Sequence, residues 1–290
     1  MKKIVYGAGV LLAGALAACS PLSVVNAVSP GGAVQATSAL RYGADPRNML
    51  DVYRPAAGVQ HAPVIVFFYG GNWVSGKRQD YAFVGRALAA RGFVVVIPDY
   101  RLYPQVRYPD FLVDGAAAVT WTVREIAAQG GDSKNIFLMG HSAGAYNAAM
   151  LALDPRWLEQ QGMTRSMLRG WIGLAGPYDF LPVQNPTTQP VFNAPDTPPD
   201  SQPLSHVSDL APPALLIAAN KDKLVDPVRN TGGMAAKLRA AHVPVQETYY
   251  DGISHTTLVA SLSNSLKKLA PTLDAVEAFV RSDGGRTAAP

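Results

Sequence analysis

A serine in the middle of the chain has the sequence context of a catalytic nucleophile. Residues 140–144 read Gly-His-Ser-Ala-Gly and fit the pattern G-x-S-x-G, in which the serine sits on a tight turn between a strand and a helix. The apolar run 135–139 is typical of a buried strand, and the Ala-, Leu- and Met-rich run 145–153 is typical of a helix. We therefore expect Ser142 to be a nucleophile, and the alternative is an ordinary serine in a glycine-rich turn.

A serine hydroxyl needs a general base within hydrogen-bond reach, and the chain has five histidines. His255 lies directly after a predicted last strand, 245–250, and before a predicted closing helix. Because chemistry gathers at the carboxyl ends of parallel strands, we expect His255 to be the base. His141 is the neighbour of Ser142, and we expect it to point elsewhere on the turn.

The base needs a carboxylate that holds its tautomer, and two aspartates follow the predicted strand 214–219. Asp226 precedes Pro227, which is a helix-start signature and gives Asp226 a structural task. Asp222 lies closer to the strand end and has no such task, so we expect it to be the acid. The chain order serine, aspartate, histidine is that of the α/β-hydrolases.

Acyl transfer passes through an oxyanion, which needs preorganised N–H donors. One donor should be the amide of Ala143, directly after the nucleophile. Others should come from the loop 69–73, which reads Tyr-Gly-Gly-Asn-Trp and follows a predicted strand. Adjacent glycines let this backbone turn its N–H groups inward. The alternative is a plain turn.

The elements that must position these residues alternate between strand and helix along the chain. This alternation predicts an α/β fold with a mostly parallel sheet flanked by helices. A Pro-rich segment, 177–213, interrupts it and is expected to be a small irregular cap over the end of the sheet. The predicted strands are 49–53 (possibly antiparallel), 64–69, 93–97, 135–139, 170–175, 214–219 and 245–250, and the further predicted helices are 81–91, 110–128, 234–241 and 258–280.

The first eighteen residues have the pattern of a secretory signal. Lys2 and Lys3 are followed by a short apolar stretch and by Leu-Ala-Ala before Cys19, the only cysteine. The stretch is shorter than the about 20 residues of a membrane-spanning helix. Leu-Ala-Ala-Cys resembles the lipobox of bacterial lipoproteins, which implies lipid modification of Cys19, and Ser20 after it implies sorting to the outer membrane, facing the periplasm. The alternative is an ordinary secretory signal.

The predicted organisation is therefore a signal peptide (1–18), a tether (19–40), a hydrolase domain (41–282) and a flexible tail (283–290). Residues 20 to 40 are mostly Ser, Pro, Gly, Ala and Val without periodicity, which is typical of a linker. A lone cysteine excludes an intrachain disulfide.

The bulk composition limits the partners of the chain. Of 290 residues, 48% are hydrophobic and 16% charged, which suits a large buried core. The formal charge of +4 falls to +2 without Lys2 and Lys3, since 23 basic residues then face 21 acidic ones, so nucleic acid is not an expected partner. We found no metal-ligand spacing and no phosphate-binding loop, and expect neither metal nor organic cofactor.

The chain resembles the HGGxW-type esterases and formamidases related to hormone-sensitive lipase, especially the feruloyl-esterase-like and kynurenine-formamidase-like branches. The resemblance implies an α/β-hydrolase fold, oxyanion-hole amides at Gly71 and Asn72 beside Ala143, and Asp222 as the triad acid. Tyr69 stands where the family has a histidine that is thought to brace the loop. The resemblance rests on residues 69–73, 98–102, 140–144, 176–179 and 222–227.

Three other residues near these motifs have structural roles in our interpretation. We expect Trp73 to be a packing anchor under the loop, and Asp99 and Arg101 to form a structural pair.

The hypothesis from the sequence is a serine hydrolase that cleaves small-molecule carboxylic esters through an acyl-enzyme. An amidase or arylformamidase would use the same three side chains, and acyl transfer to an envelope acceptor would use them as well. A hypothesis of another class is a non-catalytic scaffold of the cell envelope. The irregular segment 177–213 argues against a long-chain lipase with a helical lid, and the sequence makes no prediction of oligomeric state.

Overall fold

One eight-stranded sheet organises the molecule in the computed structural model, which describes residues 21–29 and 31–286. The predicted signal peptide and Cys19 lie outside these residues. The strand order is β1-β2-β4-β3-β5-β6-β7-β8. The strands are β1 (Val34–Arg41), β2 (Met49–Pro55), β3 (Ala62–Phe68), β4 (Val94–Pro98), β5 (Gly131–His141), β6 (Leu168–Leu174), β7 (Ala214–Ala219) and β8 (Val245–Tyr250).

Six neighbouring strands of the sheet, in the order β4-β3-β5-β6-β7-β8, run parallel and form the centre of the fold. Their continuous apolar runs, such as Ala-Leu-Leu-Ile-Ala-Ala in β7, are buried because helices cover both faces. Parallel strands end at the same edge of the sheet, so the loops after β3, β5, β7 and β8 meet there. This confirms the predicted α/β fold.

Two antiparallel strands extend the sheet at one edge. β1 is half-exposed and its register shifts between Thr37 and Leu40, where Ala39 has a φ of 58°. The amide of Ala39 donates to Oδ1 of Asp51 at 2.8 Å, so the bulge is held by a side chain of β2.

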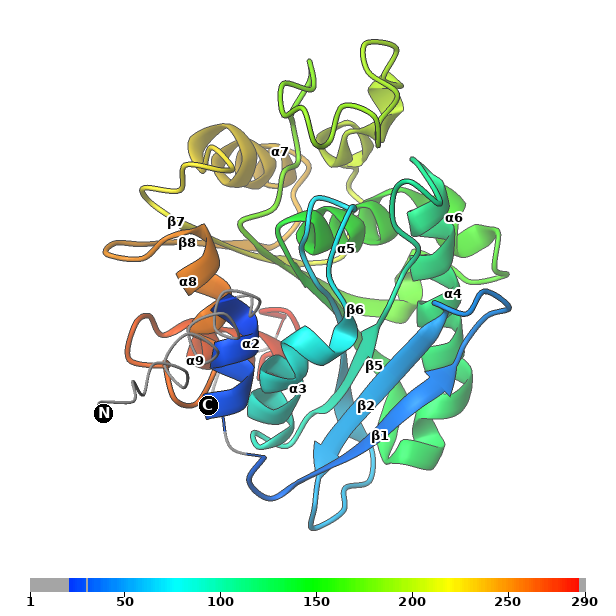
Figure 1. Cartoon of the computed structure of the whole chain (residues 1–290), viewed down its shortest axis with the longest axis vertical. Helices are drawn as coiled ribbons and strands as arrows, with labels where there is room; N and C mark the ends of the chain where they lie inside the picture. The colour runs from blue at the N-terminus through cyan, green and yellow to red at the C-terminus, as the bar shows by residue number, and fades with distance from the viewer. Residues whose placement is uncertain (1–20, 30, 287–290) are drawn as a thin grey trace, which may run out of the picture.

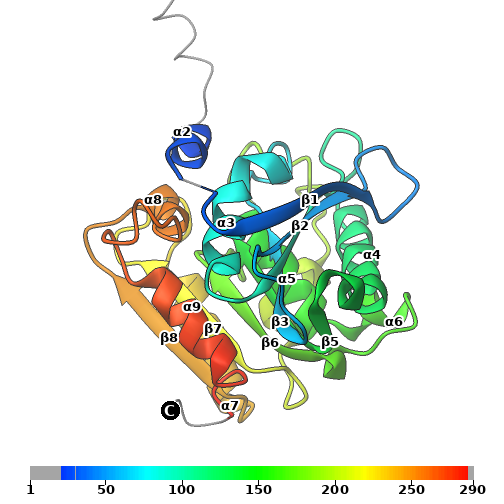
Figure 2. The same ribbon diagram turned by 90° about the horizontal axis from the view of Figure 1, so that it is seen from below.

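Helices cover both faces of the sheet (Figures 1 and 2). α3 and α9 lie on one face, and α4 and α5 lie on the other. The helices are α2 (Pro21–Val28), α3 (Ala82–Ala89), α4 (Asp110–Glu125), α5 (Ala143–Leu153), α6 (Pro155–Glu159), α7 (Gly233–Ala240), α8 (His255–Ala260) and α9 (Thr272–Arg281), with short helical turns η1 (Arg78–Tyr81), η2 (Ile126–Gln129), η3 (Arg165–Met167), η4 (Pro199–Ser201), η5 (Pro203–His206) and η6 (Val228–Gly232). No helix in the described ranges is long and apolar enough to cross a membrane.

The prediction of a tether over 19–40 is wrong for its described residues. α2 packs on the domain through Leu22 and Val25, and β1 belongs to the sheet. The physical reason is that these small and apolar residues find tertiary partners, which outweigh a composition typical of a linker. The domain therefore includes residues before its predicted start at 41.

The predicted ends of the C-terminal elements also need correction. The closing helix expected over 258–280 is two helices, since α8 ends at Ala260 and α9 begins at Thr272. Pro271, directly before α9, lacks an amide hydrogen and would interrupt a continuous helix. The tail expected to be flexible from 283 is held through residue 286, since Asp283 pairs with Arg169 and the Arg286 guanidinium donates to the Arg169 carbonyl at 2.7 Å.

The Pro-rich segment 177–213 is irregular, as predicted, and it is fixed to the domain by polar contacts. The amides of Tyr178 and Asp179 both donate to Asn230 Oδ1, at 2.7 and 2.9 Å. The Tyr146 hydroxyl on α5 donates to the carbonyl of Ser201 at 2.7 Å. The segment therefore forms a fixed wall beside the carboxyl ends of the strands.

Candidate active site

The predicted strand, turn and helix around Ser142 are present as β5, the turn and α5. Ser142 has φ 54° and ψ −124°, a conformation that costs about 1–3 kcal/mol for a residue with a Cβ. Its amide donates to Leu174 O at 2.9 Å, and its carbonyl accepts from the amides of Ala145 and Tyr146 at 2.9 and 3.1 Å. These bonds hold the strained turn in place.

Glycines on both sides of the turn are required by close packing. A Cβ on Gly140 would overlap the carbonyl oxygen of Gly144, and a Cβ on Gly144 would overlap the carbonyl oxygen of Phe68 at the end of β3. The turn is thus pressed directly against the neighbouring strand, and only glycine fits at these two places.

The structure brings His255 and Asp222 together. His255 Nδ1 donates to Asp222 Oδ2 at 2.7 Å, while Oδ1 of the same carboxylate accepts the amides of Leu224 and Val225 at 2.8 and 3.1 Å. Burial raises the pKa of Asp222, but the hydrogen bond and charge of His255 and the two amides outweigh burial and leave this pKa below its ordinary value. Asp222 is therefore ionised at neutral pH and fixes the His255 tautomer.

The second aspartate has the structural role predicted for it. Asp226 Oδ1 accepts the amides of Val228 and Arg229 at 2.9 and 3.0 Å, and so caps the start of η6.

A capping box sets the position of His255. His255 is the first residue of α8, and Ser254 before it accepts the Thr257 amide through its hydroxyl while the Thr257 hydroxyl accepts the Ser254 amide at 2.6 Å. The backbone of His255 is therefore part of a closed helical turn.

His141 does not point away from the site, and our expectation for it is wrong. Its Nε2 donates to the carbonyl oxygen of His255 at 3.0 Å, and the two rings lie 4.7 Å apart between centroids. Burial, together with the neighbouring His255, lowers the pKa of His141 to about 3, so it is neutral. The contact joins the turn of Ser142 to the loop of His255, and the sequence offered no signal for it beyond adjacency to the serine.

The side chains of Ser142 and His255 form no hydrogen bond with each other in the structure. Contacts of this kind often tighten only when substrate binds. The link through His141 keeps the two residues on the same side of the site.

The loop after β3 presents free backbone donors beside Ser142. Gly71, Asn72 and Trp73 all have positive φ, at 135°, 52° and 58°. The Gly71 carbonyl accepts the amides of residues 74 and 75, so the loop folds around it. Within the described residues, the amides of Gly71, Asn72 and Ala143 donate to no acceptor.

A pocket of about 260 Å³ opens beside Ser142. Asn72 and Ala143 line it together with the serine, whereas Gly71 does not. One wall comes from the Pro-rich segment and the other from the loop after β7. The lining residues are Asn72, Trp73, Ser142, Ala143, Pro177, Asp179, Phe180, Pro182, Val183, Gln184, Asn185, Thr188, Leu224, Val225, Asp226, Arg229 and Asn230.

Trp73 is both a packing anchor and part of this pocket. Its Nε1 donates to Asn147 Oδ1 at 2.9 Å, and its ring forms T-shaped contacts with Tyr146 and Phe192, with centroids 5.1 and 4.8 Å apart.

Among the described residues, no cluster of three or more His, Cys, Asp or Glu could hold a metal ion.

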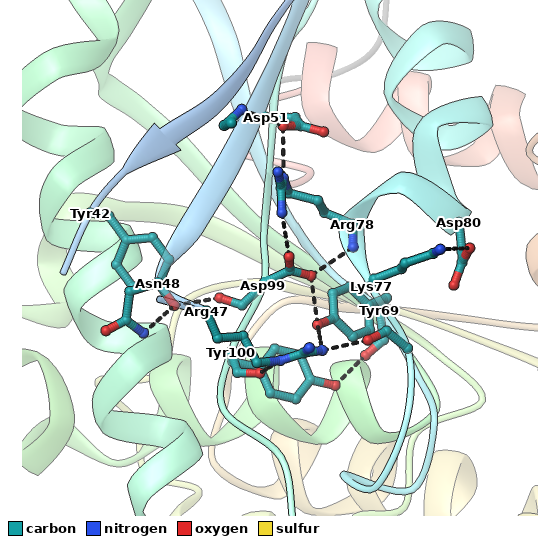
Figure 3. A network of polar contacts seen from close by, with 12 residues as sticks. Tyr42, Arg47, Asn48, Asp51, Tyr69, Lys77, Arg78, Asp80, Asp99 and Tyr100 are labelled. Atoms are coloured by element: carbon teal, nitrogen blue, oxygen red, sulfur yellow. Dashed lines mark hydrogen bonds and ion pairs between the residues drawn. The ribbon is translucent and has the colours of Figure 1, made fainter. Parts of the chain in front are cut away.

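Tyr69, which stands where the resembling family has histidine, begins the loop and is fully buried. Its hydroxyl donates to Asp99 Oδ1 at 2.9 Å and accepts from Arg47 Nη2 at 2.9 Å (Figure 3). Burial raises the pKa of Tyr69 well above its ordinary value, so the hydroxyl keeps its proton. The ring stacks on Tyr100, whose hydroxyl donates to the Tyr69 carbonyl at 2.7 Å.

Asp99 is the centre of a buried ion network (Figure 3). It accepts the amide of Arg78 at 2.7 Å and its guanidinium at 2.5 Å, and the same guanidinium binds Asp51 at 2.8 Å. Burial lowers the pKa of Arg78, but Asp51 and Asp99 outweigh it and raise this pKa above its ordinary value. The pair expected between Asp99 and Arg101 is not formed, because Arg101 binds Asp114 at 2.9 Å.

Arg47 connects this network to both ends of the loop. It lies between β1 and β2, and its Nε donates to the Tyr100 carbonyl at 2.6 Å, while its Nη2 donates to the carbonyl of Gly76 as well as to Tyr69. The loop that carries Asn72 is therefore held at its first residue and at Gly76 by one guanidinium.

Tyr69→Phe should lower kcat at the candidate active site by about 10- to 100-fold with little change in KM. The substitution removes the bonds to Asp99 and Arg47, and small displacements of catalytic donors have costs of this order. Steady-state kinetics of this variant and of Tyr250→Phe, a half-buried tyrosine on β8, measure the effect. An unchanged kcat in Tyr69→Phe would contradict this role.

His141→Gln should flatten the pH dependence of stability. Because the folded pKa of His141 lies below the unfolded value of about 6.5, its neutral form stabilises the fold above pH 6.5, and this contribution is lost as the pH falls toward 3. The free energy of unfolding, measured with urea at pH 7, 5 and 4, should fall more steeply for the natural protein than for His141→Gln. The exposed His242→Gln is the control, and equal slopes for all three proteins would refute the argument.

Comparison with known proteins places the chain in a family. The sequence model of the BD-FAE family matches residues 50–238. The chain is 29% identical over 245 residues to isoprenylcysteine alpha-carbonyl methylesterase of Arabidopsis thaliana, covering 77% of this chain and 57% of the relative. It is 32% identical over 220 residues to Esterase LipC of Mycobacterium tuberculosis, covering 69% and 54%. The chain thus spans little more than half of the length of these relatives.

Solved structures agree on the fold. Esterase B from Lactobacillus rhamnosis, in a structure with a tributyrin phosphonate, has a TM-score of 0.77 at 19% identity, covering 95% of this chain and 94% of that one. A truncated carbohydrate esterase from gut microbiota has a TM-score of 0.70 at 16% identity, covering 87% and 96%. At these identities the likeness shows the α/β-hydrolase fold. Because the family match covers more than half of the chain and the fold agrees with it, the chain belongs to the BD-FAE family of α/β-hydrolase esterases.

Proposed function

We propose that this protein hydrolyses carboxylic esters through a Ser142–His255–Asp222 triad. The observation that carries the proposal is the buried 2.7 Å bond between His255 and the ionised Asp222, beside a serine on a strained turn. The esterase names of relatives such as LipC support it.

The proposed reaction has two balanced steps. Ser142 Oγ attacks the ester carbonyl carbon while His255 Nε2 accepts the hydroxyl proton, and Asp222 stabilises the imidazolium. The oxyanion accepts the free amides of Asn72 and Ala143. When the alkoxide leaves, His255 returns the proton to it. Water then attacks the acyl-enzyme with the same base, and the acid is released as Ser142 regains its proton.

The role proposed for Gly71 is narrower than that of Asn72. Its amide has no acceptor among the described residues, yet Gly71 lies outside the pocket lining. Its positive φ of 135° and the overlap that a Cβ would make with Ser75 O mean that it shapes the loop. Its amide becomes a third donor only when the loop tightens on substrate.

The pocket favours small substrates. Its volume of about 260 Å³ lies below the roughly 300–1,000 Å³ of sites that hold drug-sized ligands. Its fixed, irregular wall argues against a movable helical lid. Trp73 and Phe180 supply apolar surface, and the amides of Gln184 and Asn185 supply polar contacts. Short-chain or small aromatic acyl groups suit these walls.

Ser142→Ala and Asp222→Asn should lower kcat on short p-nitrophenyl esters by about 10⁶-fold and 10⁴-fold, the losses that such changes cause in serine proteases. Rates on esters from two to twelve carbons, and on N-formylkynurenine, measure the specificity. Asp226→Asn is the matched control and should keep ester turnover within a fewfold.

Three outcomes would count against ester hydrolysis as proposed. Faster cleavage of N-formylkynurenine than of any ester would favour an arylformamidase. Transfer of the acyl group to added alcohols in preference to water would favour an acyltransferase. Absence of turnover in the natural protein would favour a non-catalytic scaffold.

The proposal includes localisation at the cell envelope. The signal pattern of residues 1–18 and Leu-Ala-Ala before Cys19 support lipid modification of that cysteine, and Ser20 supports sorting to the outer membrane, facing the periplasm. Two or more acyl chains hold a protein on a bilayer far more firmly than one.

Cys19→Ser should abolish lipid attachment, because the sulfur is the acceptor of the lipid. Cell fractionation of the natural protein should find it in outer membranes, with an N-terminal peptide heavier by the mass of the acyl groups. Ser20→Ala, which keeps the cysteine, is the control for lipidation. A Cys19→Ser protein that still sediments with membranes would refute the anchor.

A further inference from the structure

The outer face of α2 is apolar and open to solvent. The helix contains no charged residue. Leu22 and Val25 pack against the core, while Val24 and Val28 are 50% and 56% exposed. Because Val24 and Val28 are four residues apart, they lie on the same side of the helix, and the exposed Ala27 lies between them. A short surface helix ordinarily places polar residues there.

Hydrogen bonds fix α2 to the domain, so this face is a permanent surface. Asn26 donates to the carbonyl of Gln79 at 2.8 Å and accepts from Arg86 at 2.8 Å. Ser265 donates to the Val28 carbonyl at 2.8 Å. Figure 2 shows α2 on the outside of the molecule, beside α3 and α8.

The loop 264–269, which bonds to the end of α2, adds basic and apolar groups. Lys267 and Lys268 are exposed, and Leu269 next to them is 44% exposed. Exposed Lys77 precedes η1, which bonds to α2 through the Gln79 carbonyl, and lies 3.9 Å from Asp80, its acidic neighbour. Apolar side chains flanked by lysines match the surface of a bilayer that contains anionic lipid.

We propose that the outer face of α2 and the loop 264–269 rest on the surface of an anionic lipid bilayer. The inference depends on the proposed lipid anchor at Cys19. One residue separates Cys19 from Pro21, so two chain steps of at most 3.8 Å each separate the anchor from the helix. A lipid on Cys19 would therefore bring the start of α2 to the headgroups, where its apolar face and the lysines contact the bilayer together.

The experiment uses the full lipidated protein in vesicles of phosphatidylethanolamine and phosphatidylglycerol with brominated acyl chains, which quench nearby indole fluorescence. Val24→Trp should be quenched at least twofold. The matched control is Val228→Trp, an exposed position on η6, which runs directly into α7. Both views place α7 away from α2. It should keep its fluorescence.

Charge and anchoring are tested in the same vesicles. Quenching of Val24→Trp should weaken when phosphatidylglycerol is omitted, or when Lys267→Glu and Lys268→Glu are added, with esterase activity on a soluble ester unchanged. The mass of the N-terminal peptide reports the anchor separately.

Two results would overturn the proposal. If the peptide is lipidated and Val24→Trp is quenched no more than Val228→Trp, the face does not contact the bilayer. The same conclusion follows if the Val24→Trp emission shifts to the blue without quenching, because a second protein copy then covers the face. A peptide without lipid would refute the anchor, and esterase activity would remain as a separate question.

Discussion

The close contact between the Ser142 turn and the end of β3 is the constraint on which the rest of the site depends. The turn must present a side chain at the edge of the sheet, so its backbone takes an unfavourable conformation and leaves no room for a Cβ at Gly140 or Gly144. That same contact places the loop after β3 next to the serine. Ser142 and Asn72 thus line the same pocket.

The second requirement is that the two ends of the loop, at Tyr69 and Gly76, stay in place. Buried charges meet this need. Asp99 accepts hydrogen bonds from the Tyr69 hydroxyl and from the guanidinium of Arg78. The same guanidinium also binds Asp51. Breaking one partner of such a buried pair is costly, at about 3–5 kcal/mol. Tyrosine fits at position 69 because its hydroxyl has a donor in Arg47 and an acceptor in Asp99.

Sequence patterns could predict the fold and the residues around Ser142, His255 and Asp222, because motif, strand ends and chain order are local signals. They could not predict the contacts made by Arg47 or His141, whose partners lie far along the chain. The sequence pattern could not predict that α2 packs on the domain for the same reason, since a helix this short depends on tertiary packing. Pro271 is a local signal for the start of α9, whereas no comparable proline marks the end of α8 at Ala260.

The position of Arg47 links activity to the periphery of the fold. This residue lies in the connection of the two antiparallel edge strands, and β1 is the outermost of them and half-exposed. Edge strands open at lower free energy than the centre of a sheet. When β1 and β2 fray on warming, Arg47 would release the loop while the parallel core and its helices remain folded. Heat inactivation of this enzyme would therefore precede the loss of its secondary structure.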